Sequence, residues 1–314
     1  MNPPIEQSVV CTEQDRWLLG TLKTCEIVST VPNDAIVHWE ADGKTYCIRT
    51  STADVDESVW TGDAKNNLCH FAGTSAAIWN IGGAFVKVKA WQKDMQLESD
   101  TIEFVNSISR IPTPEVIYCW VDAQWNRSFL VLKALEGETL YEAWGSLSDS
   151  QRTEIANTVA GFCDTLASST SERLETAHGK AVQEPFLTPL ALASDPSWKP
   201  RTFGPYSATQ LQSMLSQYSV PAGQIDSFSF YHADLGPTNI IVSKDGSIAG
   251  VLDWESAAYY PKFWLGTKPL ISAGFQVSGP EKKAWAYLLA RSLENKGLSS
   301  DMGSFEAWQS AIRN

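Results

Sequence analysis

The sequence lacks the features that mark membrane, secreted and zinc-binding proteins. No apolar run approaches the ~20 residues that a membrane-spanning helix needs. The N-terminal stretch MNPPIEQSVVCTEQDRW has no basic start followed by an apolar segment, so no secretory signal is visible. The six cysteines are scattered without a C-x-x-C pair, which argues against a zinc site and a disulfide framework. These absences predict a reducing, cytoplasmic setting with most cysteines buried as small apolar side chains.

An excess of positive charge is also missing. The 314 residues include 24 lysines and arginines against 36 aspartates and glutamates, which gives a formal net charge of −12. Nucleic acids and anionic membranes attract basic surfaces, so we expect neither as a partner. The hydrophobic content of 43% and the charged content of 19% are typical of a folded chain rather than a disordered one.

A P-loop is absent although the sequence contains Gly43-Lys44-Thr45. The P-loop pattern requires a glycine five residues before Gly43, where this chain has His38, and no helical pattern follows. We interpret this stretch as the turn of a β-hairpin whose strands cover 35–40 and 45–50.

Strand patterns dominate the first 132 residues. Residues 75–81 and 84–91 flank a Gly-Gly turn and predict a second hairpin, in which Lys87 and Lys89 share one face of the second strand. A helix is predicted over 97–108, ended by the IPTP that follows, and 128–135 is a nearly continuous apolar strand.

Helical patterns dominate after Gly137. Residues 148–169 begin with capping Ser and Asp and place apolar side chains along one helical face. A short helix is predicted near TQLQSMLSQY, and EKKAWAYLLARSLENKG is amphipathic. We therefore predict an α+β protein with two lobes: a β-rich N-terminal lobe over 1–132 with an extra N-terminal hairpin segment, and a larger, mainly helical C-terminal lobe over 133–314.

Four polar residues interrupt apolar strand patterns in the second lobe. Residues 231–239 read YHADLGPTN, followed by IIV, the turn SKDG and IAGVLDWES. Hairpin pairing of the two short strands would bring Asn239 beside Asp253, with Asp234 on the incoming loop. An amide and a carboxylate oxygen are ligands that Mg²⁺ takes from proteins, and Asp234 could accept a proton from an attacking hydroxyl. The alternative is that Asp234 and Asp253 only cap turns.

The same residues resemble a known family. His-Ala-Asp-Leu-Gly-Pro-Thr-Asn is similar to the H-x-D-x-x-x-x-N catalytic loop of the protein-kinase superfamily, and Leu-Asp-Trp-Glu to its second metal-binding segment. The form is that of the aminoglycoside phosphotransferase (choline-kinase-like) branch, particularly its fungal-type group. Ala233 and Gly236 depart from the residues common in that branch, but neither change removes a ligand. No Ala-Pro-Glu follows, so a protein kinase is not expected.

The resemblance implies a two-lobed, protein-kinase-like fold and a nucleotide site. Gly73-Thr74-Ser75 would form the turn over the phosphates. Lys87, or alternatively Lys89, would be the strand lysine that steadies them. Glu98 would pair with that lysine, with Glu103 as the second choice. The backbone from Lys133 to Leu135 would bind adenine.

The resemblance also implies the chemistry. Asn239 and Asp253 would hold Mg²⁺ and Asp234 would be the catalytic base, with His232 supporting the loop through hydrogen bonds. We therefore expect a cytoplasmic, ATP- and Mg²⁺-dependent transferase, a small-molecule kinase whose partner is a hydroxylated acceptor. The alternatives are a pseudokinase-like binding protein and a different catalyst on the same fold, because fold does not fix function.

Overall fold

The computed structural model describes residues 3–51, 67–73, 75–190, 195–196, 198–216, 225 and 227–313. They form a mixed α+β protein whose N-terminal part is rich in strands. The chain divides into two compact units. Unit 1 comprises Met1–Lys93, Glu115–Ala134 and Ser194–Pro200, and unit 2 comprises Asp94–Pro114, Leu135–Ala193 and Arg201–Asn314. The lobe boundary at 132/133 stays a prediction.

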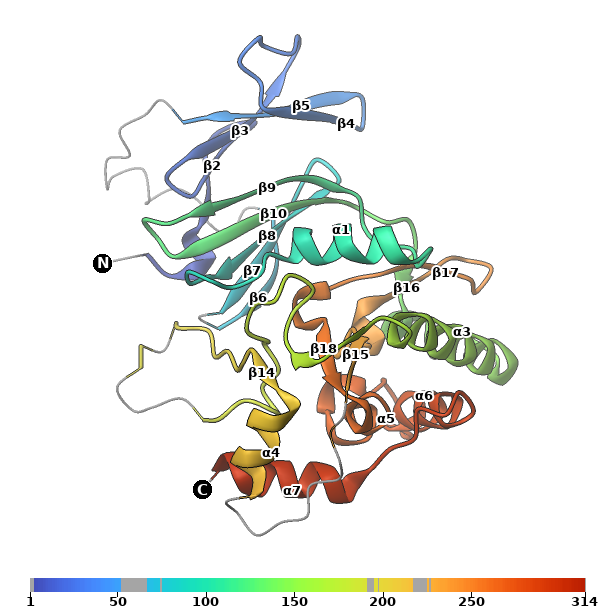
Figure 1. The fold of residues 1–314 in the computed structure, drawn as a ribbon. Coiled ribbons are helices and arrows are strands. Elements are labelled where there is room, and N and C mark those ends of the chain that lie inside the picture. Colours follow the sequence, from blue (N-terminus) through green and yellow to red (C-terminus); the bar gives the residue numbers. More distant parts are fainter. Residues whose placement is uncertain are drawn as a thin grey trace. The chain divides into compact units, whose positions relative to one another are not determined.

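Unit 1 contains two antiparallel sheets, with strand orders β1-β2-β3-β5-β4 and β6-β7-β8-β10-β9 (Figure 1). The strands are β1 (Val9–Glu13), β2 (Arg16–Leu19), β3 (Lys23–Val28), β4 (Val37–Ala41), β5 (Lys44–Thr50), β6 (Leu68–Ala72), β7 (Ala76–Ile81), β8 (Ala84–Ala90), β9 (Val116–Asp122) and β10 (Arg127–Lys133). Both predicted hairpins are confirmed: β4 pairs with β5, and β7 with β8. Their turns, Asp42-Gly43 and Gly82-Gly83, have positive φ at both residues, as tight hairpin turns require.

The two sheets of unit 1 share one apolar core. Trp17 and Tyr46 of the first sheet belong to the same buried cluster as Trp79 and Val86 of the second. The N-terminal sheet is also tied down by Asp122 of β9, whose carboxylate accepts hydrogen bonds from the Thr21 amide (2.7 Å) and hydroxyl (2.9 Å). The segment before residue 51 is therefore integrated into unit 1 by both apolar packing and partly buried hydrogen bonds.

Gly82 allows a close contact between the two sheets, and its substitution should separate packing from backbone conformation. A Cβ on Gly82 would overlap the ring of Tyr46, whereas a Cβ on Gly43 would meet nothing. Both glycines have positive φ. We expect Gly43→Ala to cost roughly 1–2 kcal/mol of unfolding free energy, and Gly82→Ala roughly 1–3 kcal/mol more because the ring must move. Denaturant unfolding measures both; equal losses would contradict the close contact.

Unit 2 contains helices and three small sheets. The helices are α1 (Glu98–Ile108), α2 (Leu140–Ala143), α3 (Asp149–Ala167), α4 (Ala208–Ser216), α5 (Lys262–Ile271), α6 (Ala284–Glu294) and α7 (Met302–Arg313). The strands are β11 (Glu138–Thr139), β12 (Thr170–Ser171), β13 (Arg173–Leu174), β14 (Tyr206–Ser207), β15 (Phe228–Tyr231), β16 (Ile240–Val242), β17 (Ile248–Val251) and β18 (Ala258–Pro261). The sheet orders are β11-β16-β17, β12-β15-β18 and β13-β14.

The predicted helices over 97–108 and 148–169 are confirmed as α1 and α3, and α4 and α6 also lie where the sequence indicated them. Ser148 caps α3 by accepting a hydrogen bond from the Gln151 amide (3.3 Å). The expectation of a mainly helical second lobe needs correction, since unit 2 mixes helices with sheets. These strands are two to four residues long, too short to show an alternating pattern.

Helix α1 packs within unit 2, and its first turn lies beside the residues that follow β17. Phe104 packs edge-on against Phe230 of β15, with ring centroids 5.0 Å apart. After the helix, the Pro112 carbonyl accepts a hydrogen bond from the Val251 amide (2.9 Å). Glu98 is the first residue of α1, so these contacts position its carboxylate.

Candidate active site

The polar residues of the second lobe are placed by the β16–β17 hairpin. Ile240 pairs with Val251, and the Leu252 amide donates to the Asn239 carbonyl (2.8 Å). Asn239 directly precedes β16 and Asp253 follows β17 by two residues, so both lie at one end of the hairpin. The pairing that the sequence indicated is present.

His232 supports this arrangement from a fully buried position. Its Nδ1 accepts a hydrogen bond from the Asp234 amide (3.2 Å), and its Nε2 lies 2.9 Å from the Leu252 carbonyl oxygen. An amide can only donate, so Nδ1 carries no proton and the proton is on Nε2. A neutral His232 therefore links the loop of Asp234 to the residue before Asp253. Its ring also packs edge-on against Trp254, with centroids 4.5 Å apart.

Asn239 orients Asp234 and has an oxygen suited to a cation. Its Nδ2 donates to the Asp234 carbonyl oxygen (2.9 Å) and to Asp234 Oδ2 (3.0 Å). Because the amide nitrogen is turned toward Asp234, the Oδ1 atom is the one that Asn239 can offer as a ligand. An amide oxygen and the Asp253 carboxylate form a donor set that fits Mg²⁺.

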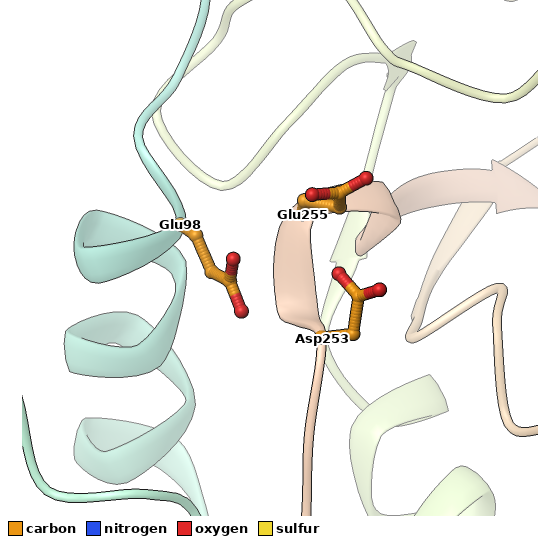
Figure 2. A group of neighbouring side chains, drawn as sticks. All are labelled: Glu98, Asp253 and Glu255. Atoms are coloured by element: carbon orange, nitrogen blue, oxygen red, sulfur yellow. The ribbon is translucent and has the colours of Figure 1, made fainter. Parts of the chain in front are cut away.

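Asp253 stands in a left-handed backbone conformation, with φ 63° and ψ 62°. The next residue, Trp254, donates its amide hydrogen to Glu98 Oε1 (3.1 Å). Figure 2 shows Glu98 reaching from α1 toward Asp253 and Glu255. One carboxylate oxygen from each of these residues lies within 4.8 Å of the others. Like charges this close repel one another, and a cation bound among them would offset that repulsion.

The loop that carries Asp234 contacts α6 and a turn that follows α5. The indole Nε1 of Trp285 in α6 donates to the Leu235 carbonyl (3.0 Å). Gly236 touches the backbone of Gly274 so closely that a Cβ on Gly236 would overlap the Gly274 carbonyl oxygen. These contacts fix the loop without using any atom of the Asp234 side chain.

A buried ion pair lies deeper in unit 2. Lys268 Nζ of α5 is 2.6 Å from Glu184 Oε2, and the two side chains are 5% and 0% exposed. The other Glu184 oxygen accepts from the Phe186 amide (3.1 Å), and Lys268 lies over the Phe186 ring. Burial raises the pKa of Glu184 even with Lys268 beside it. Burial likewise holds the pKa of Tyr231 well above its ordinary value.

Several predicted site residues belong to unit 1. Gly73 and Ser75 lie in the turn between β6 and β7, where the Ser75 amide donates to Ala72 (3.1 Å), while Thr74 lies outside the described residues. Lys87 is on β8 and is 8% exposed, and Lys89 is partly exposed. Glu98 belongs to unit 2, so the expected ion pair between Lys87 and Glu98 stays a prediction.

The stretch predicted to bind adenine ends β10. The backbone amide of Lys133 donates to the backbone carbonyl of Glu115 (3.0 Å), and that of Ala134 donates to the backbone carbonyl of Gly83 (3.1 Å). An adenine contact here would therefore use carbonyl groups or the backbone of Leu135. The Leu135 side chain lies over Gly250 in unit 2, where a Cβ would overlap it.

Sequence reasoning missed Glu184, Lys268, Trp285 and Gly274. Glu184 and Gly274 are far from the motif in sequence and carry no local pattern. Lys268 had a usable signal, because it is a single charge in the otherwise apolar and polar-neutral run FWLGTKPLI and is followed by a proline inside α5. A lone charge in such a run indicates burial with a partner.

These features agree with a comparison against protein families. Residues 87–262, more than half of the chain, match the model of the phosphotransferase enzyme family. The chain belongs to this family. The matched range includes the end of β8 from Lys87, all of α1 and every residue placed at the β16–β17 hairpin.

Comparison with solved structures finds distant likenesses. An apo form of a thermostable mutant of aminoglycoside phosphotransferase APH(4)-Ia is 18% identical, with a TM-score of 0.46, covering 79% of this chain and 84% of that one. A ternary complex of such a mutant with AMP-PNP and hygromycin B is 16% identical, with a TM-score of 0.46, covering 78% and 83%. The GDP complex of aminoglycoside 2'-phosphotransferase-IIIa is 13% identical, with a TM-score of 0.46, covering 76% and 80%.

The family assignment rests on the family model, because the structural scores are too low to add to it. No curated protein sequence matches the chain significantly. In the part of the chain that the structure describes, no helix combines the length and the apolar composition that crossing a membrane requires.

Proposed function

We propose that the protein transfers the γ-phosphoryl group of ATP, with Mg²⁺, to a hydroxyl of a small molecule. The proposal includes a two-lobed, kinase-like arrangement with lobes over 1–132 and 133–314. Membership of the phosphotransferase enzyme family supports a phosphoryl transfer reaction. The proposal further specifies ATP as the phosphoryl donor and an alcohol as the acceptor.

One observation carries the proposal: Asn239 holds the Asp234 carboxylate while its own oxygen remains suited to a cation. The hydrogen bonds from Nδ2 to Asp234 fix the amide in this orientation. The hairpin pairing and the contact of His232 with the Leu252 carbonyl support a role for Asp253 at the same end of the hairpin as Asn239. Residues that only capped turns would not need this linkage between a base, an amide oxygen and a second carboxylate.

In the proposed mechanism, Asp234 accepts the proton of the attacking hydroxyl and orients its oxygen toward the phosphorus. Asn239 Oδ1 and Asp253 would hold Mg²⁺. When bound, the ion would neutralise negative charge on the transferred phosphoryl group. Catalysis then consists mainly of positioning and electrostatics. His232, neutral and bonded through both ring nitrogens, keeps the loop in place and transfers no proton.

We assign the nucleotide contacts to the remaining predicted residues. Lys87 is the preferred phosphate lysine over Lys89, because it is the more buried of the two and a buried lysine needs an anionic partner. Glu98 would orient it. The turn at Gly73 to Ser75 would cover the phosphates, and the Lys133–Leu135 backbone would receive the adenine.

The acceptor is proposed only as a small hydroxylated molecule. The APH(4)-Ia complex contains hygromycin B, an aminoglycoside, together with AMP-PNP. At 16% identity this observation does not transfer a substrate to the present chain. It does make aminoglycosides reasonable first probes.

Thermal unfolding with Mg-ATP tests the proposed nucleotide site. A ligand at ~100 times its dissociation constant stabilises a protein by ~2.7 kcal/mol, so the wild-type midpoint should rise. Asp253→Asn should lose most of this rise, because asparagine removes the charge while tolerating the left-handed backbone. EDTA should have the same effect on the wild type.

The outcomes separate the possible functions. A wild-type rise that is lost in Asp253→Asn supports the metal-nucleotide site. A rise without ADP formation on any hydroxylated acceptor would favour a binding protein. No rise at millimolar nucleotide would contradict the proposal. The unfolding midpoints without nucleotide serve as the control for a general loss of stability.

A further inference from the structure

An exposed turn lies against the loop that carries Asp234. This turn, η5 (Ala273–Phe275), follows α5 and is anchored by Phe275, which is fully buried. The Ser272 amide donates to the Lys268 carbonyl (3.2 Å), and Ser272 Oγ accepts from the Gly274 amide (3.3 Å). Ala273 and Gly274 themselves are exposed. The turn is therefore fixed at both ends while it presents two small residues to solvent.

The turn and the Asp234 loop touch backbone to backbone. Gly236 has an ordinary φ of −66°, so its conformation does not require glycine. A Cβ on Gly236 would overlap the Gly274 carbonyl oxygen, which means that space, not backbone freedom, requires glycine there. The contact holds Gly274 at a fixed distance from Asp234.

Gly274 lies beside one particular oxygen of the proposed base. Asn239 donates to Asp234 Oδ2 (3.0 Å). A Cβ built on Gly274 would lie 3.7 Å from the other oxygen, Oδ1, and 3.4 Å from Ser272 Oγ. These are ordinary contact distances, so an alanine would fit without moving the backbone. It would, however, fill the space next to Oδ1.

The space beside Oδ1 is within reach of an acceptor that gives its proton to this oxygen. A hydroxyl that gives its proton to Asp234 has to approach within ~2.6–3.2 Å of a carboxylate oxygen. The carbon that bears the hydroxyl then lies roughly 4 Å or less from Oδ1, which is the shell that a side chain at position 274 would occupy. An acceptor that approaches Oδ1 from the side of Gly274 would compete with such a side chain for one volume.

We propose that Gly274 determines which acceptors reach Asp234, by leaving room beside Oδ1 for an alcohol on a bulky, ring-bearing framework. This inference rests on the proposed function, since it concerns the acceptor of that reaction. A larger residue at this position should restrict the protein to small acceptors such as water or a linear alcohol. Gly274 acts through the space it leaves and is a specificity-determining residue.

The test compares ADP formation from Mg-ATP with water alone, ethanolamine, kanamycin and hygromycin B. For a ring-bearing alcohol that the wild type uses, Gly274→Val should raise KM by at least about tenfold, the range that small steric changes produce in specificity. Gly274→Ala, which fits the turn, should show a smaller rise. The thermal shift with Mg-ATP should stay at the wild-type value in both variants. Gly145→Val, at an exposed glycine with open space around it, is the matched control and should change nothing.

The failures are distinguishable. If the wild type uses a ring-bearing alcohol and Gly274→Val keeps the same KM for it, this inference is wrong and the proposed function stands. A wild type that uses only water or ethanolamine also overturns the inference, because the space beside Oδ1 would then serve no bulky acceptor. If no alcohol stimulates ADP formation by the wild type, the proposed function fails and the inference fails with it.

Discussion

Asp234→Asn is expected to lower kcat for phosphoryl transfer by roughly 100- to 10,000-fold, the usual contribution of a positioned general base. Asparagine has nearly the same shape and can still accept the hydrogen bond from Asn239 Nδ2 through its oxygen. It cannot take a proton from the acceptor. The loss should therefore appear in kcat, with little change in the KM for ATP.

The measurement is steady-state ADP formation with any acceptor that the wild type uses. The Mg-ATP thermal shift of Asp234→Asn should match that of the wild type, which would show that the fold and the nucleotide site survive. A variant that keeps more than a tenth of wild-type kcat would remove Asp234 from the proposed role. His232→Asn serves as a comparison: it should lower stability as well as activity, because His232 is buried and links two loops.

Lys268→Met is expected to destabilise the protein by roughly 3–5 kcal/mol, the cost of leaving one member of a buried ion pair without its partner. Methionine has a similar length and can pack on Phe186 and Trp264, so loss of packing is kept small. Glu184, which is fully buried, would then have to take up a proton or draw in water. Urea unfolding at neutral pH measures the loss.

The double variant Lys268→Met with Glu184→Leu provides the control. Replacing both charges with apolar groups removes the uncompensated carboxylate, so most of the lost stability should return. A single variant that loses less than about 1 kcal/mol would show that the pair is hydrated in solution and not buried as the structure has it.

Local chemistry made much of the fold predictable. The Asp42-Gly43 and Gly82-Gly83 turns made the β4–β5 and β7–β8 hairpins predictable, since few residue pairs tolerate positive φ twice in succession. The capping Ser148 and the apolar face behind it gave α3. The pairing of Phe228–Tyr231 with Ala258–Pro261 was out of reach, because strands this short and buried on both faces carry no alternation.

The candidate site was predictable where its members lie on one hairpin. Asn239 and Asp253 flank a hairpin whose two strands and turn can be recognised in the sequence, so their proximity was predictable. Glu98 was predicted from the family resemblance, but as a partner of a lysine; its hydrogen bond to the Trp254 amide was not foreseen. Gly274 touches the loop only through tertiary packing, and a single exposed glycine carries no sequence signal of such a contact.

The left-handed backbone at Asp253 limits which residues could replace it if the proposed phosphoryl transfer were lost over evolutionary time. At φ 63° a residue with a full side chain pays roughly 1–2 kcal/mol, whereas glycine pays none and asparagine little. A descendant released from selection for phosphoryl transfer would still be under selection for folding. It should therefore replace this aspartate with asparagine or glycine far more often than with alanine or valine, and an inactive lineage would be recognisable by that bias alone.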